Sequence, residues 1–392
     1  MAGANLDIAI AGGGIGGLAV AIALSRLGIS SQVFERRAEF PDEGAGIQIG
    51  PNGTRILQSL GVAELLQERA AIPDALSVRD GITGRELTRL PLGEWISKRH
   101  GAPYWTAHRK DLHKALRRRA ESEPLITLNP GVEITSFVND GESIKVIGNT
   151  GEVANASLLI GADGLWSNVR KQIAPAVWPQ PVGKAAFRSV VSADRLPAEL
   201  IPNAVHIWLA PGAHIVHYPV NGGRDIALVV IANDKALQPG WENVTSAEVP
   251  HNKVLDFASS VQSLIQRADE WRQWTLYSLP SLTRWSAGRA VLLGDAAHPM
   301  LPFLAQGAVM ALEDAETLAE CSASSRNDMK AALQKFAQQR RYRVRRVAEA
   351  SERNGRIYHM TGASALARNV TMRLMPPTHV MAGFNWLYGW RI

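Results

Sequence analysis

Residues 6–35 read LDIAIAGGGIGGLAVAIALSRLGISSQVFE, and this stretch decides the fold. Leu6–Ala11 is a short apolar run, which is typical of a buried parallel strand. Residues 15–28 have helical periodicity that stops at Gly28, and Ser31–Glu35 is a second β-rich run. The order of strand, glycine turn, helix and strand predicts the first unit of a nucleotide-binding α/β domain.

The turn between the first strand and the helix consists almost entirely of glycine. Gly12, Gly14 and Gly17 fit the pattern G-x-G-x-x-G, with Ile15 and Gly16 at the start of the helix. A bound pyrophosphate needs backbone N–H groups at close range, and a Cβ would obstruct that approach. The N-terminus of the helix adds a field that favours an anion. The turn is therefore a predicted pyrophosphate site, and a glycine turn without a ligand is the alternative.

A carboxylate stands at the end of the second strand. Glu35 follows Gly17 by eighteen residues, a position from which it would accept hydrogen bonds from ribose hydroxyls. The same charge would repel a 2′-phosphate. We therefore expect FAD or NAD, rather than NADP, at this turn.

Two later Gly-Asp turns each join the end of a strand to the start of a helix. The first is GADGLWSNVR at residues 161–170, which contains Asp163. The second is GDAAHP at residues 294–299, which contains Asp295 and is followed by Gln306-Gly307. A buried aspartate at such a turn can accept from sugar-like hydroxyls, or it can be an ordinary helix cap.

Taken in order, G-x-G-x-x-G, GADGxxSxVR and GDAAHPxxPxxxQG resemble the motifs of the FAD-dependent aromatic-ring hydroxylases, from about residue 6 to 350. These single-component flavoprotein monooxygenases include salicylate, 3-hydroxybenzoate and 6-hydroxynicotinate hydroxylases. The resemblance implies hydroxylation of a phenolic or heteroaromatic carboxylate with NADH or NADPH and O₂, through a flavin C4a-hydroperoxide. A flavin epoxidase or N-hydroxylase, and a non-catalytic flavin-binding sensor, are the alternatives.

The resemblance also implies which residues hold FAD. The glycines would bind the pyrophosphate and Glu35 the adenosine ribose. The remaining contacts would come from Arg36 near the adenine, Arg109 near the phosphate and ribityl chain, Asp163 near the pyrophosphate, Asp295 at a ribityl hydroxyl, and the helix start at Gly307 and Ala308 facing the flavin pyrimidine edge.

The substrate side is expected on the phrase GAHIVHYP, residues 212–219. Strand alternation places His214, Val216 and Tyr218 on one face and His217 on the other. By the resemblance, His214 and Tyr218 are the pair that binds the phenolic oxygen of the substrate. Two strand residues that fill a half-polar sheet face are the alternative.

Four further residues are predicted to contact the substrate. Arg188 could bind a carboxylate through a bidentate fork, or it could be a surface strand residue. Ile47 and Phe303 stand where the 6-hydroxynicotinate enzymes have His, so this pocket should be more apolar and should not suit 6-hydroxynicotinate. Pro299 completes the set, and the preceding His298 is expected to be mostly structural.

The length of 392 residues suits two domains with discontinuous boundaries. We expect an α/β fold with a Rossmann-like FAD-binding domain, an inserted β-rich substrate domain and C-terminal helices. The predicted pieces are 1–75, 105–175 and 285–325 for the FAD-binding domain, 76–104 and 176–284 for the substrate-binding domain, and 326–392 for the helical region.

Composition excludes several classes of protein. The single Cys321 excludes a disulfide framework, a thiolate zinc site and a dithiol redox couple, and we expect no metal. A net charge of +6 suits small anions better than nucleic acid. Neither a membrane span nor a signal peptide is visible, so we expect a cytoplasmic protein that is a monomer or homodimer. The basic run Lys335–Arg346 is expected to be a solvated or oligomer-facing helix.

Overall fold

A six-stranded sheet is built around the first strand of the chain, in a computed structural model that describes residues 7–39, 45–201, 203–234, 243–325 and 328–392. The strand order is β18-β19-β11-β1-β2-β7, and only the β18–β19 pair is antiparallel. The strands are β1 (Asp7–Ala11), β2 (Ser30–Glu35), β7 (Ile126–Pro130), β11 (Leu158–Gly161), β18 (Ser286–Ala287) and β19 (Ala290–Leu292). The predicted strand–helix–strand unit is confirmed: α1 (Ile15–Ser25) connects β1 to β2, and the chain turns at Gly28 (φ +71°).

A second, eight-stranded sheet has the order β16-β17-β12-β15-β14-β13-β4-β5. Adjacent strands in this sheet pair antiparallel, except β13 and β4, which are parallel. Its strands are β4 (Ala75–Asp80), β5 (Glu86–Pro91), β12 (Gln180–Ser192), β13 (Ala204–Ala210), β14 (Ala213–Val220), β15 (Asp225–Asn233), β16 (Asn243–Thr245) and β17 (Trp271–Ser278). The α/β class and the β-rich middle of the chain are thus as predicted.

Two small sheets complete the strands. One has the order β10-β9-β8 and the other pairs β3 with β6. Their bounds are β3 (Gly46–Ile49), β6 (Trp105–His108), β8 (Ile134–Asn139), β9 (Ile144–Gly148) and β10 (Gly151–Ala156). Along the chain, β3 and β6 each stand between a strand of one large sheet and a strand of the other.

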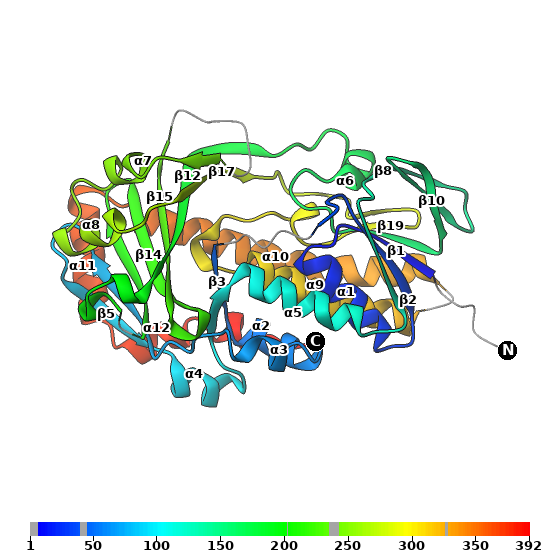
Figure 1. Ribbon diagram of the computed structural model, residues 1–392. Coiled ribbons are helices and arrows are strands. Elements are labelled where there is room, and N and C mark those ends of the chain that lie inside the picture. Colours follow the sequence, from blue (N-terminus) through cyan, green and yellow to red (C-terminus); the bar gives the residue numbers. More distant parts are fainter. Residues whose placement is uncertain (1–6, 40–44, 202, 235–242, 326–327) are drawn as a thin grey trace.

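Helices lie between and around the sheets. Figure 1 shows the eight-stranded sheet at the left, the six-stranded sheet at the right, and α9 and α10 extending between them. The bounds are α2 (Pro51–Ser59), α3 (Ala63–Gln67), α4 (Gly93–His100), α5 (Arg109–Glu121), α6 (Asn168–Ile173), α7 (Glu248–Asn252), α8 (Ser259–Gln266), α9 (Gly307–Ser324), α10 (Met329–Tyr358), α11 (Gly362–Leu374), α12 (Pro377–Ala382) and α13 (Asn385–Tyr388). Within the described ranges, no helix is both long and apolar enough to cross a membrane.

The segment from 75 to 105 is short and rich in turns, yet most of it is regular structure. It forms β4 and β5, which close one edge of the eight-stranded sheet, and then α4. The alternation was hard to recognise because β5 is an edge strand that carries charged residues, with Glu86 accepting from Ser77 and lying near Arg89. Its apolar residues Leu87 and Leu90 are nevertheless buried, and it pairs with β4.

The C-terminal tail packs over the body of the protein. Arg55 of α2 donates to the carbonyl oxygens of Trp390 (2.7 Å) and His100 (2.6 Å). The Tyr388 ring makes edge contacts with Tyr104 and His100. The tail therefore ends on α2, close to the helices that carry the site described next.

Candidate active site

The glycine turn has the geometry of a phosphate cradle. Gly12 has φ +103°, and a Cβ there would lie 2.4 Å from the carbonyl oxygen of Ala162. A Cβ on Gly17 would lie 1.9 Å from the carbonyl oxygen of Gly12. By contrast, a Cβ on Gly14 would meet no protein atom within 4 Å. The outer glycines are thus required by the chain itself, whereas the middle one leaves open space for a ligand at the start of α1.

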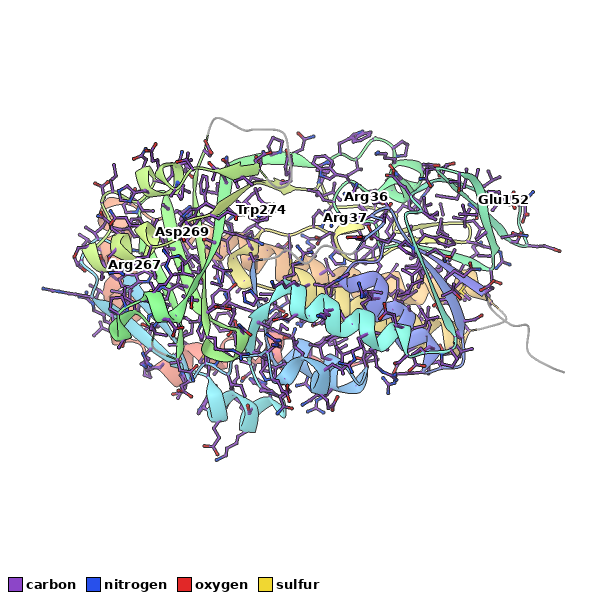
Figure 2. All side chains as sticks on the ribbon, in the orientation of Figure 1. Arg36, Arg37, Glu152, Arg267, Asp269 and Trp274 are labelled. Atoms are coloured by element: carbon purple, nitrogen blue, oxygen red, sulfur yellow. The ribbon has the colours of Figure 1, made fainter. Side chains whose placement is uncertain are left out.

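Glu35 lies against this turn. Its Oε2 accepts from the backbone N–H of Gly13 at 2.9 Å, and its Oε1 accepts from Arg37 N–H at 3.0 Å. The carboxylate is therefore held at the loop, where ribose hydroxyls would reach it. Arg36 is exposed immediately after β2 (Figure 2), so it is available at the outer, adenine side of the predicted site.

The two Gly-Asp turns behave differently. Asp163 accepts from Val169 N–H at 3.1 Å and so supports the start of α6, and burial raises the pKa of its carboxyl. Its Oδ1 is buried without a hydrogen-bond partner among the described residues. Its neighbours Ala162 and Gly164 line a cavity of about 310 Å³, here called the central cavity, whereas Asp163 itself does not. Asp295, in the second turn, lines that cavity directly, as a ligand of the ribityl chain would.

The N-terminus of α9 opens into the same cavity through Gly307 and Ala308. The chain enters this helix through Ala305, which has φ +52°, the left-handed region that non-glycine residues rarely occupy. Such a conformation persists only where the surroundings fix it. It turns the first N–H groups of an 18-residue helix toward the cavity, where they favour a negative charge.

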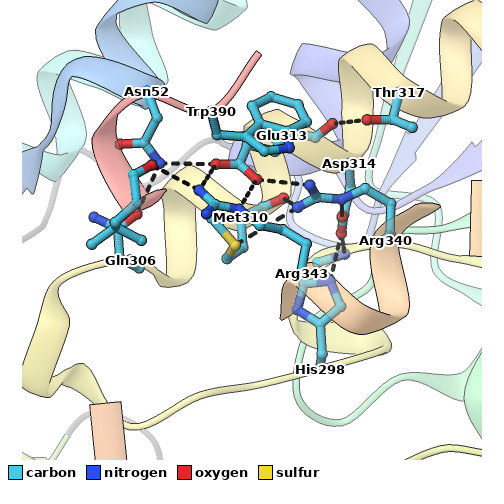
Figure 3. Close-up of polar contacts among 12 residues, drawn as sticks. Asn52, His298, Gln306, Met310, Glu313, Asp314, Thr317, Arg340, Arg343 and Trp390 are labelled. Carbon is cyan, nitrogen blue, oxygen red and sulfur yellow. Dashed lines mark hydrogen bonds and ion pairs between the residues drawn. The ribbon is translucent and has the colours of Figure 1, made fainter. Parts of the chain in front are cut away.

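A buried ionic network fixes α9 and the turn that carries Asp295 (Figure 3). Arg340 of α10 donates to Glu313 (2.7 Å) and Asp314 (2.6 Å) of α9, and all three side chains are almost completely buried. Arg343 donates to Glu313 at 2.8 Å, and Glu313 also accepts from Asn52 at 2.8 Å. These hydrogen bonds satisfy the buried charges, as burial of ions requires.

The network continues into the second Gly-Asp turn. Asp314 accepts from the N–H of Gly294 at 3.0 Å and contacts His298 Nε2 at 2.5 Å. The expectation that His298 is structural is confirmed. The expectation of a solvated helix at 335–346 is wrong for Arg340 and Arg343, since both turn inward to acidic partners on α9. Charge counting along one helix cannot reveal partners on another.

The predicted substrate strand, β14, presents the expected face. His214, Val216 and Tyr218 line the central cavity, whereas His217 points to the other side, where Trp208 donates to it at 3.2 Å. Burial raises the pKa of Tyr218 to about 12, although Arg188 and a hydrogen bond with Gln48 lower it in part. Tyr218 is therefore a hydrogen-bond donor at neutral pH.

Arg188 is half-buried and lines the cavity. It is on β12, lines the cavity with Arg109, and has its guanidinium 5.0 Å from the centre of the Trp274 ring (Figure 2 labels Trp274). Burial lowers the pKa of Arg188, and Arg109 acts in the same direction. Two cations in one cavity favour an anionic ligand.

The central cavity, of about 310 Å³, brings the cofactor motifs and the substrate strand together. Ile47 lines it as predicted. Its walls include Gly14, Ile15, Gly16, Ile47, Gln48, Arg109, Arg188, His214, Val216, Tyr218, Val229, Ile231, Asp295, Met300, Pro302, Gly307 and Ala308. Gln48 and Met300 also line the cavity, although no motif in the sequence indicated either residue.

A second, more apolar cavity of about 600 Å³ adjoins the first, and His214, Gln48 and Pro302 line both. Phe303 lines this second cavity, with its ring 5.5 Å from that of His214. A Cβ on Gly355 of α10 would lie 2.6 Å from the Phe303 ring. The prediction that Pro299 contacts the substrate is wrong, since Pro299 lines neither cavity. The contact between His298 and Asp314 anchors this turn, and Met300 is the next residue that reaches the first cavity.

Residues 5–351 match the family described as FAD binding domain. The chain is 38% identical over 385 residues to 3-hydroxybenzoate 6-hydroxylase 1 of Aquipseudomonas alcaligenes, which covers 98% of this chain and 97% of that one. It is 34% identical to the 6-hydroxynicotinate 3-monooxygenase of Pseudomonas fluorescens, over 80% of this chain and 82% of that one. The chain belongs to the FAD-dependent aromatic-ring hydroxylases.

A solved structure of Klebsiella pneumoniae HpxO complexed with FAD and uric acid has the same fold, with a TM-score of 0.87 at 24% identity, covering 97% of this chain and 96% of that one. The hydroxylase family uses FAD, and the site fits it: the open space at Gly14 suits a phosphate, and the placed Glu35 and the cavity-lining Asp295 suit hydroxyls. The chain is therefore a flavoprotein monooxygenase.

Proposed function

We propose that this hydroxylase acts on a phenol that carries a carboxylate, of the hydroxybenzoate type, with NADH or NADPH and O₂ as co-substrates. The observation that carries the proposal is the shared cavity, which is lined by His214 and Tyr218, by the cofactor motifs and by the half-buried cation Arg188. The Tyr218 hydroxyl and His214 imidazole match a phenolic oxygen, and the Arg188 guanidinium matches a carboxylate. The similarity to 3-hydroxybenzoate 6-hydroxylase 1 supports the same class.

When bound, FAD would accept a hydride from the nicotinamide and supply activated oxygen to the ring. Gly12, Gly14 and Gly17 would hold its pyrophosphate and Glu35 its ribose. The remaining cofactor contacts that we propose are Ile15, Gly16, Arg36, Arg109, Asp163, Asp295, Gly307 and Ala308. The helix dipole of α9 would stabilise negative charge on the reduced cofactor.

The chain's own residues would prepare the substrate. His214 and Tyr218 would bind the phenolic oxygen, and removal of its proton makes the ring a better nucleophile. Arg188 would fix the carboxylate, which sets the ring carbon that receives oxygen. Val216 and Ile47 would pack on the ring and exclude water.

We also propose how the chain divides this work. Residues 1–75, 105–175 and 285–325 would form the FAD-binding domain, 76–104 and 176–284 the substrate-binding domain, and 326–392 a helical region that supports both. The six-stranded sheet draws its strands from the first set, and the eight-stranded sheet draws its strands from the second.

A coupled assay tests the substrate class. The FAD-loaded enzyme is incubated with NADH, O₂ and single hydroxybenzoates or hydroxypyridine carboxylates, while NADH loss and product mass are recorded together. We expect a product heavier by one oxygen with a hydroxybenzoate and little product with 6-hydroxynicotinate. Unchanged turnover in His214→Ala and Tyr218→Phe would instead favour epoxidation or N-hydroxylation of a non-phenolic substrate.

A further inference from the structure

A chain of hydrogen bonds leads from the substrate-facing histidine toward the protein surface. His214 Nδ1 lies 2.8 Å from His359 Nε2, and His359 Nδ1 lies 2.9 Å from Lys184 Nζ. Lys184 also donates to Asn233 Oδ1 at 2.6 Å. The three linked groups come from β14, from the residue after α10 and from β12, so the connection exists only in the folded chain.

Exposure increases along this chain. The His214 side chain is buried, with 1% of its surface exposed, whereas His359 and Lys184 are partly exposed. Because Nδ1 of His214 is occupied by His359, Nε2 is the ring nitrogen that remains for a ligand in the cavity. One end of the chain therefore faces the substrate position, and the other end is within reach of water.

The chemistry of the three groups allows a proton to pass without charging a histidine. A neutral imidazole has one N–H donor and one acceptor nitrogen, and a neutral amine can accept a proton that an ammonium cannot. In one arrangement every donor points outward, from the substrate hydroxyl to the lysine. In the other arrangement every donor points inward, from the lysine ammonium to the substrate oxygen.

We propose that His214, His359 and Lys184 form a proton relay that carries the phenolic proton of the substrate to bulk water, which rests on the proposed function above. The substrate O–H bond breaks as His214 Nε2 gains that proton. His214 Nδ1 gives its proton to His359 Nε2, and His359 Nδ1 gives its proton to the neutral Lys184 amine. The products are a phenolate, two neutral imidazoles and an ammonium, and Lys184 then loses a proton to water.

The surrounding charges suit this role. Arg188 of β12 and Tyr218 of β14 line the cavity together with His214. The Tyr358 ring of α10 contacts the His214 ring, and Arg368 of α11 acts electrostatically on His359. Burial lowers the pKa of His359 to about 4, with Lys184 and Arg368 acting in the same direction. Burial also lowers the pKa of His214 well below its usual range. Both rings therefore stay neutral, and the cations favour a phenolate.

Proton release on binding is the direct readout. The oxidised, FAD-loaded enzyme is mixed with 3-hydroxybenzoate in weak buffer that contains a pH indicator dye, and phenolate absorbance is followed in parallel. We expect rapid proton release in the natural protein, with a rate that rises with pH as the lysine ammonium loses its proton. No NADH or oxygen is present, so the readout does not depend on turnover.

Three substitutions separate a relay from a structural role. Lys184→Arg keeps the positive charge, but a guanidinium cannot accept a proton at these pH values. His359→Gln keeps a hydrogen-bonding side chain beside His214 but cannot pass a proton. Lys184→Met removes both the charge and the amine. We expect each of the three substitutions to slow proton release on the order of 10²-fold and to leave the flavin spectrum unchanged. The exposed Lys98→Met on α4 is the matched control and should leave the rate unchanged.

The outcomes distinguish the relay from the proposed function. If Lys184→Arg and His359→Gln release the proton as fast as the natural protein, the relay is overturned even though the enzyme makes hydroxylated product. If the natural protein binds the phenol and releases its proton but makes no hydroxylated product, the proposed function fails. Slower release in the variants would then still support the relay.

Discussion

His298 Nε2 lies 2.5 Å from Asp314 Oδ2, and the other oxygen of the same carboxylate accepts from Arg340 at 2.6 Å. One buried carboxylate thus connects the turn that carries Asp295 to the long helix α10. Because Asp295 lines the cavity, the position of this proposed cofactor contact depends on the buried contacts of Asp314 with His298 and Arg340.

Arg340→Met should be among the most destabilising substitutions in the protein. It leaves Glu313 and Asp314 as buried carboxylates without their shared partner, which costs about 3–5 kcal/mol. Urea unfolding of the FAD-loaded protein measures the change in the free energy of unfolding. Arg341→Met, one residue along and exposed, is the control and should change it by less than about 0.5 kcal/mol. Equal stability of the two variants would contradict a supporting role for the network.

The same network predicts loss of stability in acid. Burial raises the pKa of Asp314, but His298 and Arg340 outweigh it and hold the pKa at about 2, against an ordinary 3.8. A pKa that is lower in the folded state stabilises the fold above pH 3.8, by about 2 kcal/mol. This contribution is lost as the pH falls from about 4 to 2. Unfolding of Asp314→Asn should lack this part of the acid dependence, and parallel curves for the two proteins would contradict it.

Two glycine substitutions should separate folding from cofactor binding. Gly17→Ala places a Cβ 1.9 Å from a backbone oxygen, so it should weaken both the apoprotein and FAD affinity. Gly14→Ala meets no protein atom within 4 Å, so the apoprotein should keep its stability while FAD binds more weakly. Thermal unfolding of the apoprotein and titration with FAD measure the two effects. Normal FAD affinity in Gly14→Ala would show that the open space there is not used by the pyrophosphate.

Arg188→Met should weaken binding of carboxylate substrates. A charge-assisted hydrogen bond to a carboxylate contributes about 1.5–3 kcal/mol, so Kd for 3-hydroxybenzoate should rise roughly 10- to 100-fold. Flavin absorbance changes on titration of the holoenzyme measure the Kd. The uncharged 3-hydroxybenzamide is the control, since its affinity should change little. If both ligands weaken equally, Arg188 supports the shape of the cavity rather than binding the carboxylate.

The sequence was most informative where function depends on the backbone near a motif. The glycine turn, the strand register of His214 and Tyr218, and the helix start at Gly307 could all be predicted because local spacing determines them. The inward direction of the Arg340 side chain could not be predicted, because its acidic partners lie on another helix, α9. His359 had no motif at all, and it meets His214 only because α10 ends against β14.

The Phe303 ring occupies the space that a side chain at position 355 would need, and residue 355 is glycine. Glycine inside a helix lowers its stability by about 1 kcal/mol relative to alanine. Helix α10 is therefore less stable at Gly355, where the Phe303 ring packs against it. Efforts to change the substrate range should therefore vary the two positions together. A smaller residue at 303 would leave a void that alanine at 355 could fill, whereas alanine at 355 alone would collide with the ring.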